Sequence, residues 1–255
     1  MTSSVGSGPD LALIHGWGLG SWVWLSLLEH LSRKFRVHLL DLPGYGRAPA
    51  DGADLGTTAQ ALLAALPDRV TLCGWSLGGT LAMRAASLAP ERIAGLVLVG
   101  ATPCFTQRND WQAGQTPELL DRFSASVKAQ PEQALQRFVT LLSQGDAGAR
   151  AITRSLLSGL REVELPDTKA LQHGLSWLRE VDLRPLASAI TNRSLLVHGE
   201  NDALNPLLAA RWLSGQLPDS HLEVFAGVGH VPFLANPDRF VRLLDDFCHA
   251  SPAPA

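Results

Sequence analysis

Residues 70–79 read VTLCGWSLGG. The apolar run Val70–Cys73 predicts a buried strand, and Gly78–Ala89 has the pattern of a helix. Between them lies a G-x-S-x-G motif centred on Ser76, a strand-to-helix turn so sharp that the flanking residues must be small. We therefore predict that Ser76 is a nucleophile at the carboxyl end of a strand. The alternative is a glycine-rich turn whose serine only caps the helix.

Strand and helix signals alternate on both sides of this motif. Fully apolar strands that alternate with helices predict an α/β fold, a mostly parallel sheet with helices on both faces. In such sheets the chemistry lies at the carboxyl ends of the strands. The other predicted strands are Leu11–Ile14, Val37–Leu40, Ile93–Val99, Ser194–Val197 and His221–Phe225, and the predicted helices around them are Trp22–Leu31, Thr57–Leu66 and Pro237–His249.

The segment 105–180 lacks strand signals and is dominated by helical patterns, as at Glu118–Lys128, Pro131–Ser143 and Ala147–Leu160. We expect one α/β core, residues 1–104 and 181–255, interrupted by a helical insertion at 105–180. A chain of 255 residues is long enough for this arrangement.

Composition excludes several protein classes. Hydrophobic residues make up 46% and charged residues 18% of the chain, which is typical of globular proteins, and the net charge of −3 does not suggest a nucleic-acid partner. The three cysteines are too few and too scattered for a disulfide framework or a metal pair. Neither a signal peptide nor a membrane span is visible. We expect a cytoplasmic protein that needs no metal or cofactor and contacts no membrane.

A serine hydroxyl needs a base oriented by an acid, and in this fold the acid and then the base follow the serine along the chain. Asp202 follows the predicted strand Ser194–Val197, and His230 follows His221–Phe225. Both are expected on the same edge of the sheet as Ser76.

Other acids and histidines remain as alternatives. Glu200 is the main rival acid, and Asp182 lies at the end of the insertion. His15, His198 and His221 each lie beside a strand and are interpreted as structural, because a triad needs only one base.

Acyl transfer creates an oxyanion that two preorganised N–H groups must bind. One would be the backbone N–H of Leu77, directly after the serine, and the other that of Trp17 in the HGWG stretch at residues 15–18. The side chains of Trp17 and Trp75 either flank this site or belong to the core.

Four stretches together carry a family resemblance: HGWG at 15–18, DLPGYGR at 41–47, GWSLGG at 74–79 and TPCF at 102–105. The chain resembles the α/β-hydrolase superfamily over nearly its whole length and, within it, the pimeloyl-[acyl-carrier protein] methyl ester esterases of biotin synthesis. The resemblance implies the triad Ser76, Asp202 and His230 and an oxyanion site at Trp17 and Leu77. It also implies hydrolysis of the methyl ester of a pimeloyl-carrier protein, with release of methanol.

The resemblance further implies that the insertion is a lid that docks an acyl-carrier protein. Residues 122–154 contain five basic and two acidic residues. The implied docking residues are Arg137, Arg150 and Arg154, with Arg161 on the same face if the helix continues; at Gln133 the chain departs from the family pattern, where another docking arginine stands. The implied substrate contacts are Trp17, Phe138, Val139, Thr140, Leu141 and Leu142. We expect a monomer.

Two rival functions fit the same residues. The first is a different hydrolase on the same core, such as a short-chain carboxylesterase, a lactonase or a carbon–carbon bond hydrolase, which would not need a docking face. The second is a non-catalytic small-molecule receptor, since this fold serves both roles.

Overall fold

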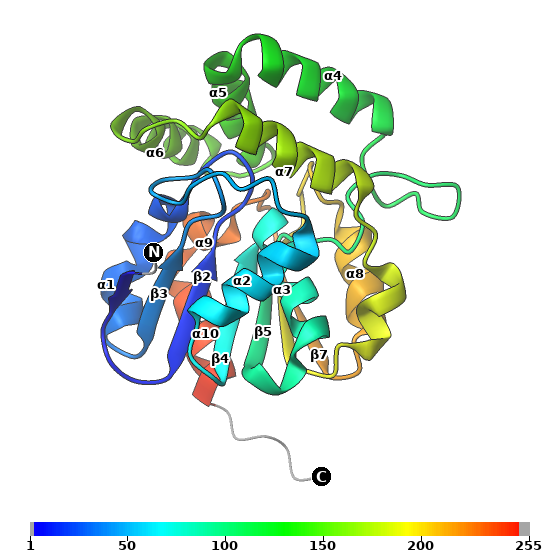
Figure 1. Cartoon of the computed structure of the whole chain (residues 1–255). Helices are drawn as coiled ribbons and strands as arrows, with labels where there is room; N and C mark the ends of the chain where they lie inside the picture. Colours follow the sequence, from blue (N-terminus) through cyan, green and yellow to red (C-terminus); the bar gives the residue numbers. More distant parts are fainter. Residues whose placement is uncertain (1–2, 250–255) are drawn as a thin grey trace.

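The core of the computed structural model, which describes residues 3–249, is a seven-stranded sheet with the order β1-β3-β2-β4-β5-β6-β7 (Figure 1). All neighbouring strands are parallel except β1, which is antiparallel to β3. The first two and the last six residues of the expected core lie outside the described residues. The strands are β1 Ser3–Val5, β2 Asp10–Ile14, β3 Arg36–Leu40, β4 Val70–Trp75, β5 Ile93–Val99, β6 Ser194–Gly199 and β7 Ser220–Phe225.

Helices cover both faces of the sheet, so the predicted fold class is confirmed (Figure 1). One face carries α1 and α10, which contact each other, and the opposite face carries α2 and α3. The central strands β4 and β6 are buried along their whole length, which explains why apolar residues dominate their sequences. The helices of the core are α1 Leu25–Ser32, α2 Leu55–Ala65, α3 Leu77–Leu88, α8 Leu207–Gln216, α9 Pro232–Ala235 and α10 Pro237–His249, joined by the 3₁₀ helices η1 Ser21–Trp24, η2 Pro90–Arg92 and η3 Arg184–Ala189.

Four further helices lie between β5 and β6 along the chain and sit above the carboxyl ends of the strands (Figure 1). Proline occupies the first helical position of α4 and of α5, where its missing N–H costs nothing, and Thr116 caps α4 by accepting a hydrogen bond from Leu119 N. These helices are α4 Pro117–Ala129, α5 Pro131–Leu142, α6 Ala149–Glu162 and α7 Thr168–Glu180.

The two ends of this helical segment meet. Cys104 and Asp182 form an isolated antiparallel bridge, and Leu183 N donates a hydrogen bond to Pro103 O at 2.8 Å. The segment therefore leaves the sheet and returns to it at nearly the same place.

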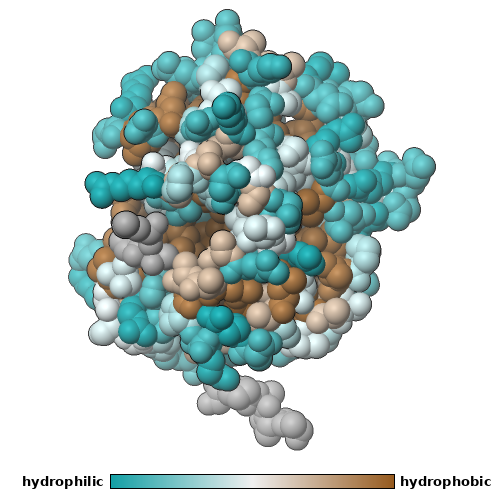
Figure 2. All heavy atoms as spheres, in the orientation of Figure 1, coloured by the Kyte–Doolittle hydropathy of each residue, from teal (hydrophilic) through white to brown (hydrophobic). Residues whose placement is uncertain are grey.

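The surface of the four helices is mainly hydrophilic in the view of Figure 2, whereas hydrophobic residues show where these helices meet the core. Within residues 3–249, every helix is too short or too polar to cross a lipid bilayer.

Candidate active site

Ser76 occupies the turn between β4 and α3 with φ +54° and ψ −116°, a strained conformation for a residue with a side chain. Its N–H donates to Val99 O at 2.9 Å, which ties the turn to β5. A Cβ on Gly78 would lie 2.5 Å from Ile14 O, so only glycine allows α3 to approach β2 this closely. The hydroxyl of Ser76 makes no capping hydrogen bond to α3. The serine is thus held at the strand end without serving as a helix cap.

His230 and Asp202 form a buried pair at the same edge of the sheet. His230 Nδ1 lies 2.6 Å from Asp202 Oδ2, and the two residues are 1% and 5% exposed. Asp202 Oδ1 accepts hydrogen bonds from the backbone N–H groups of Leu204 and Asn205 at 2.9 and 2.8 Å. Burial alone would raise the pKa of Asp202, but the charge of His230 and its hydrogen bond hold that pKa below its ordinary value. The aspartate therefore remains a carboxylate at neutral pH.

The other ring nitrogen of His230 is free. Its Nε2 is buried and makes no hydrogen bond within residues 3–249. The backbone of His230 is fixed, because its carbonyl accepts the indole N–H of Trp75 at 2.9 Å and its N–H donates to Leu142 O at 3.0 Å. A buried imidazole that is oriented by a carboxylate and has an unused Nε2 has the geometry of a general base.

The rival histidines use their ring nitrogens on local partners. His15 Nδ1 donates to Gly16 O, and its Nε2 accepts from the backbone N–H of Leu42 at 3.0 Å. His198 Nε2 donates to Asn205 O at 2.7 Å, and burial lowers its pKa. His221 pairs with a carboxylate on the exposed part of β7.

The rival acids also have other partners. Asp182 forms a bidentate contact with Arg184, and Glu200 accepts a hydrogen bond from Gly227 N at the surface. Within residues 3–249, His230 forms its hydrogen bond and ion pair with Asp202 and not with either of these acids.

The HGWG loop lies against the serine. A Cβ on Gly16 would lie 3.2 Å from Ser76 Cβ. The backbone N–H groups of Trp17 and Leu77 make no hydrogen bond within residues 3–249, and Leu77 is the first residue of α3, where a helix leaves N–H groups without intrahelical partners. Both N–H groups are therefore left without an internal acceptor within residues 3–249, as an oxyanion site requires.

The indole of Trp17 is locked in place. Its Nε1 donates to Leu171 O at 2.8 Å, and Gly174 lets α7 pack directly on the ring. Its ring meets Phe138 edge-on at a centroid distance of 4.9 Å. Trp75, by contrast, is buried between His230 and Phe233, in the core below the site.

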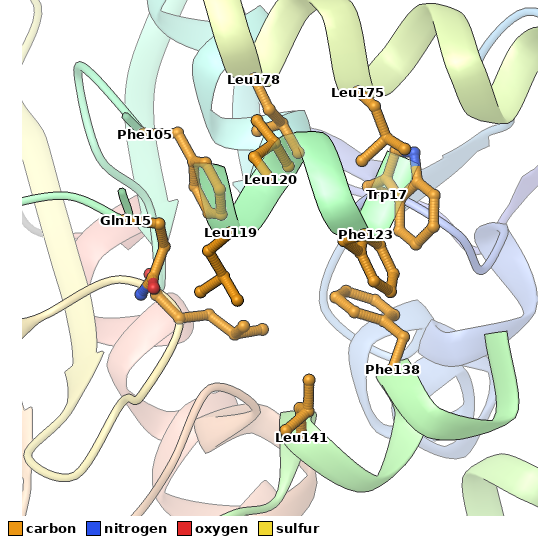
Figure 3. Close-up of a pocket in the computed structure, with 11 residues that line it drawn as sticks. Trp17, Phe105, Gln115, Leu119, Leu120, Phe123, Phe138, Leu141, Leu175 and Leu178 are labelled. Carbon is orange, nitrogen blue, oxygen red and sulfur yellow. The ribbon is translucent and has the colours of Figure 1, made fainter. Parts of the chain in front are cut away.

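An apolar pocket of about 110 Å³ opens beside Trp17, between the core and α4, α5 and α7 (Figure 3). In Figure 3 the rings of Trp17, Phe123 and Phe138 gather on one side, opposite Phe105 and Gln115. The pocket is lined by Trp17, Phe105, Gln115, Leu119, Leu120, Phe123, Phe138, Leu141, Leu175, Leu178 and Leu204.

Three of the six expected substrate contacts, Trp17, Phe138 and Leu141, line this pocket. Val139 and Leu142 are instead fully buried in the core, and Thr140 lies on a neighbouring groove. Sequence reasoning missed the pocket side chains of α4 and α7. Their spacing was a usable signal, since Leu119 and Phe123 are four apart and Leu175 and Leu178 three apart, as on one helix face.

A second groove, of about 750 Å³, runs between α5 and α6 and is called here the arginine groove. Arg150, Arg154 and Arg161 line it, whereas Arg137 is exposed on α5 outside it. None of these four arginines forms an ion pair within residues 3–249. α6 continues to Glu162, so the expectation that Arg161 joins the other two on one helix is confirmed.

Across the described residues, no three His, Cys, Asp or Glu side chains gather in a way that could hold a metal ion.

Comparisons with known proteins show the family of the chain. Residues 11–243 match the alpha/beta hydrolase family. The pimeloyl-[acyl-carrier protein] methyl ester esterase of Nitrosomonas europaea is 39% identical over 243 residues, covering 95% of this chain and 96% of that protein. The enzyme of the same name from Aromatoleum aromaticum is 40% identical, covering 93% of this chain and 97% of that protein.

Solved structures give the same fold. An esterase from Exiguobacterium antarcticum has a TM-score of 0.89 at 25% identity and covers 98% of this chain and 95% of its own. An enol-lactonase from Burkholderia xenovorans has a TM-score of 0.85 at 20% identity over 98% of this chain and 96% of its own, a likeness of fold alone. The chain belongs to the alpha/beta hydrolase family and, within it, to the family of the pimeloyl-[acyl-carrier protein] methyl ester esterases.

Proposed function

We propose that this protein is a serine esterase that hydrolyses the methyl ester of pimeloyl-[acyl-carrier protein] in biotin synthesis. The observation that carries the proposal is the buried pair of His230 and Asp202, with a free Nε2, at the same sheet edge as the strained Ser76. The relatives that match over nearly the whole chain bear the name of this activity.

In the first half of the reaction, His230 Nε2 takes the proton of the Ser76 hydroxyl while Oγ attacks the ester carbonyl carbon. The carbonyl oxygen becomes an oxyanion, which the N–H groups of Trp17 and Leu77 bind. The tetrahedral intermediate collapses, His230 returns the proton to the departing methoxide, and methanol leaves. Asp202 keeps the proton of the neutral ring on Nδ1 and stabilises the imidazolium.

In the second half, water takes the place of methanol. His230 accepts a proton from the water, whose oxygen attacks the acyl-enzyme carbonyl, and the same two N–H groups bind the new oxyanion. Collapse releases Ser76, which regains its proton from His230. The product is the free carboxylate at the end of the pimeloyl chain.

The apolar pocket beside Trp17 suits the methylene chain of the substrate. Each methylene group that leaves water contributes roughly 0.8 kcal/mol. The rings of Phe123 and Phe138 and the leucines of α4, α5 and α7 provide such a surface.

We assign the segment 105–180 as a lid that presents Arg137, Arg150 and Arg154 to the acidic surface of an acyl-carrier protein. Arg150 and Arg154 are one helical turn apart on α6 and lie at the arginine groove with no internal ion pair within residues 3–249, so their charge is available to a partner. This carrier protein would be met in the cytoplasm, where we place the enzyme as a monomer. The three unpaired cysteines fit that compartment.

The test compares the wild type with Ser76→Ala and His230→Ala, using p-nitrophenyl butyrate and a methyl pimeloyl-carrier protein. Both variants should lose about 10⁴-fold or more in kcat on both substrates. The wild-type gene, but not Ser76→Ala, should rescue a biotin auxotroph that lacks its own esterase. Wild-type turnover by Ser76→Ala would refute the proposal.

A receptor function on this fold is separated by a cheaper experiment. A fluorophosphonate probe should label the wild type at Ser76 and leave Ser76→Ala unlabelled. Absence of labelling together with absence of a p-nitrophenol burst would favour a non-catalytic receptor instead.

A further inference from the structure

The loop between α5 and α6, residues 143–148, contacts both loops that carry Asp202 and His230. Gly229 N donates to Asp146 Oδ2 at 3.0 Å, one residue before the histidine. Asn201 Nδ2 donates to Gly145 O at 3.0 Å, one residue before the aspartate. These contacts join the segment above the sheet to the two residues that orient each other at its edge.

The two sides of this contact are closely fitted. A Cβ on Gly229 would lie 2.7 Å from Gln144 O and 3.1 Å from Asp146 Oδ2. A Cβ on Gly145, which has φ +87°, would lie 2.7 Å from Asn201 Cβ. The 143–148 loop therefore has no room to slide past the loops that carry Asp202 and His230, so a small displacement of one loop displaces the others.

Asp146 is the only ionisable side chain of this loop. Its carboxylate is partly buried, and burial together with the charge of nearby Asp202 raises its pKa, while the hydrogen bond from Gly229 N opposes the rise. Within residues 3–249 the Gly229 N–H is its only hydrogen-bond partner across this contact. A partly buried carboxylate loses some of its hydration, so the hydrogen bond from Gly229 N is favourable.

We propose that Asp146 is a positioning residue for His230: it holds the Gly229 amide and thereby fixes the imidazole between Asp202 and Ser76. The inference rests on the proposed role of His230 as the base. The same loop continues into α6, so the hydrogen bond also links the helix that carries Arg150 and Arg154 to the base.

The test uses Asp146→Ala, which removes the acceptor, and Asp146→Asn, which keeps a carbonyl oxygen at the same place. Asp146→Ala should lower kcat on p-nitrophenyl butyrate by about 10- to 100-fold, the cost of a misplaced catalytic group, with KM changed by less than about twofold. Labelling of Ser76 by a fluorophosphonate should slow in parallel. Asp146→Asn should retain kcat within about threefold of the wild type, because the hydrogen bond survives.

Asp54→Ala is the matched control. Asp54 also accepts backbone N–H groups, from Gly56 and Thr57, but at the start of α2, outside the site. Its loss should lower the melting temperature and leave kcat unchanged, which separates positioning from a general loss of stability.

Two results would overturn the inference: wild-type kcat in Asp146→Ala, or an equal loss of kcat in the alanine and asparagine variants. With Ser76→Ala inactive, either result leaves the proposed function intact. Activity in Ser76→Ala would instead remove the proposed function itself.

Discussion

His230 Nδ1 and Asp202 Oδ2 lie 2.6 Å apart in a region closed to solvent, and the second oxygen of Asp202 is occupied by two backbone N–H groups. Asp202→Asn should therefore lower kcat by about 10⁴-fold, because an amide no longer holds the ring in the required tautomer. Initial rates on p-nitrophenyl butyrate measure the loss. Glu200→Gln, which changes an exposed carboxylate two residues away, should keep wild-type kcat. The reverse pattern would make Glu200 the acid.

His15 should make the stability of the fold depend on pH. Its Nε2 accepts the Leu42 N–H, so a proton there would face another donor, and burial lowers the pKa of His15 below its ordinary 6.5, against the smaller opposing effects of Gly16 O and Asp41. When the pKa of a histidine is lower in the folded than in the unfolded protein, its contribution to the free energy of unfolding is complete above the unfolded-state pKa. That contribution is lost as pH falls towards the folded-state pKa.

The measurement is the free energy of unfolding between about pH 7.5 and pH 5. The wild type should lose stability on acidification more steeply than His15→Gln, by up to about 1.4 kcal/mol per pH unit. His198 is also buried with a lowered pKa, so the free energy of unfolding of His15→Gln should still fall somewhat on acidification. Parallel curves would show that His15 does not contribute.

The close approach of α3 to β2 gives a stability prediction. Gly78→Ala places a methyl group 2.5 Å from Ile14 O and should destabilise the protein by about 1–3 kcal/mol in chemical denaturation. Gly215→Ala in α8 is the control, since nothing lies within 4 Å of its added Cβ. Gly215→Ala should stabilise the protein by about 0.5 kcal/mol. A Gly78→Ala protein as stable as the wild type would contradict the packing argument.

The pocket mouth should control chain-length preference. Leu141 lines the pocket but is 40% exposed, so Leu141→Trp narrows the entrance without crowding the core. The variant should lose about 10-fold in kcat/KM on p-nitrophenyl octanoate and less than about twofold on the acetate. Leu208→Trp, at an exposed position of α8, should leave kcat/KM unchanged for both esters. Equal losses on both esters would argue against this pocket as the acyl site.

The arginine groove should matter only for a protein-borne substrate. Reversing the charge in Arg150→Glu with Arg154→Glu should raise KM for methyl pimeloyl-carrier protein by about 10-fold at low salt and leave p-nitrophenyl esters unaffected. Added salt should weaken binding of the carrier protein to the wild type and so narrow the difference in KM between the wild type and the double variant. Arg211→Glu with Arg242→Glu, on α8 and α10, is the matched pair. Equal effects of the two pairs would indicate only a change in overall charge.

Much of the sheet was predictable because its signals are local. The apolar run before Ser76 and the glycines around it specify a strand and a sharp turn, whatever the rest of the chain does. β1 was missed, because Ser3–Val5 has no pattern of its own and exists as a strand only through its pairing with β3. α8 was missed as well, since its apolar stripe is weak.

Two features of the candidate site depend on packing and could not be predicted from the sequence: which histidine beside Asp202 keeps a free Nε2, and which side chains of α5 face the pocket. Chain order pointed to Asp202 and His230, yet His198 also lies beside Asp202, at 3.4 Å. The structure separates the two histidines: His198 Nε2 is bonded to Asn205 O, whereas His230 is closer to Asp202, at 2.6 Å, and its Nε2 has no partner within residues 3–249. Within α5, which side chains face the pocket depends on how α4 and α6 pack against it. Val139 therefore points into the core while Leu141 reaches the pocket.

The bridge between Cys104 and Asp182 has an evolutionary consequence. Because the segment starts and finishes at one point above the sheet, its length and sequence can change without altering the strand pairing beneath it, and the entropic cost of a longer loop grows only slowly. Gene exchange or drift within this segment would retarget the enzyme to a new acyl donor while the inherited turn at Ser76 stays as it is. Substrate range is thus heritable separately from the strand pairing, whereas Leu142 and Asp146, which hold the His230 loop, have to be kept.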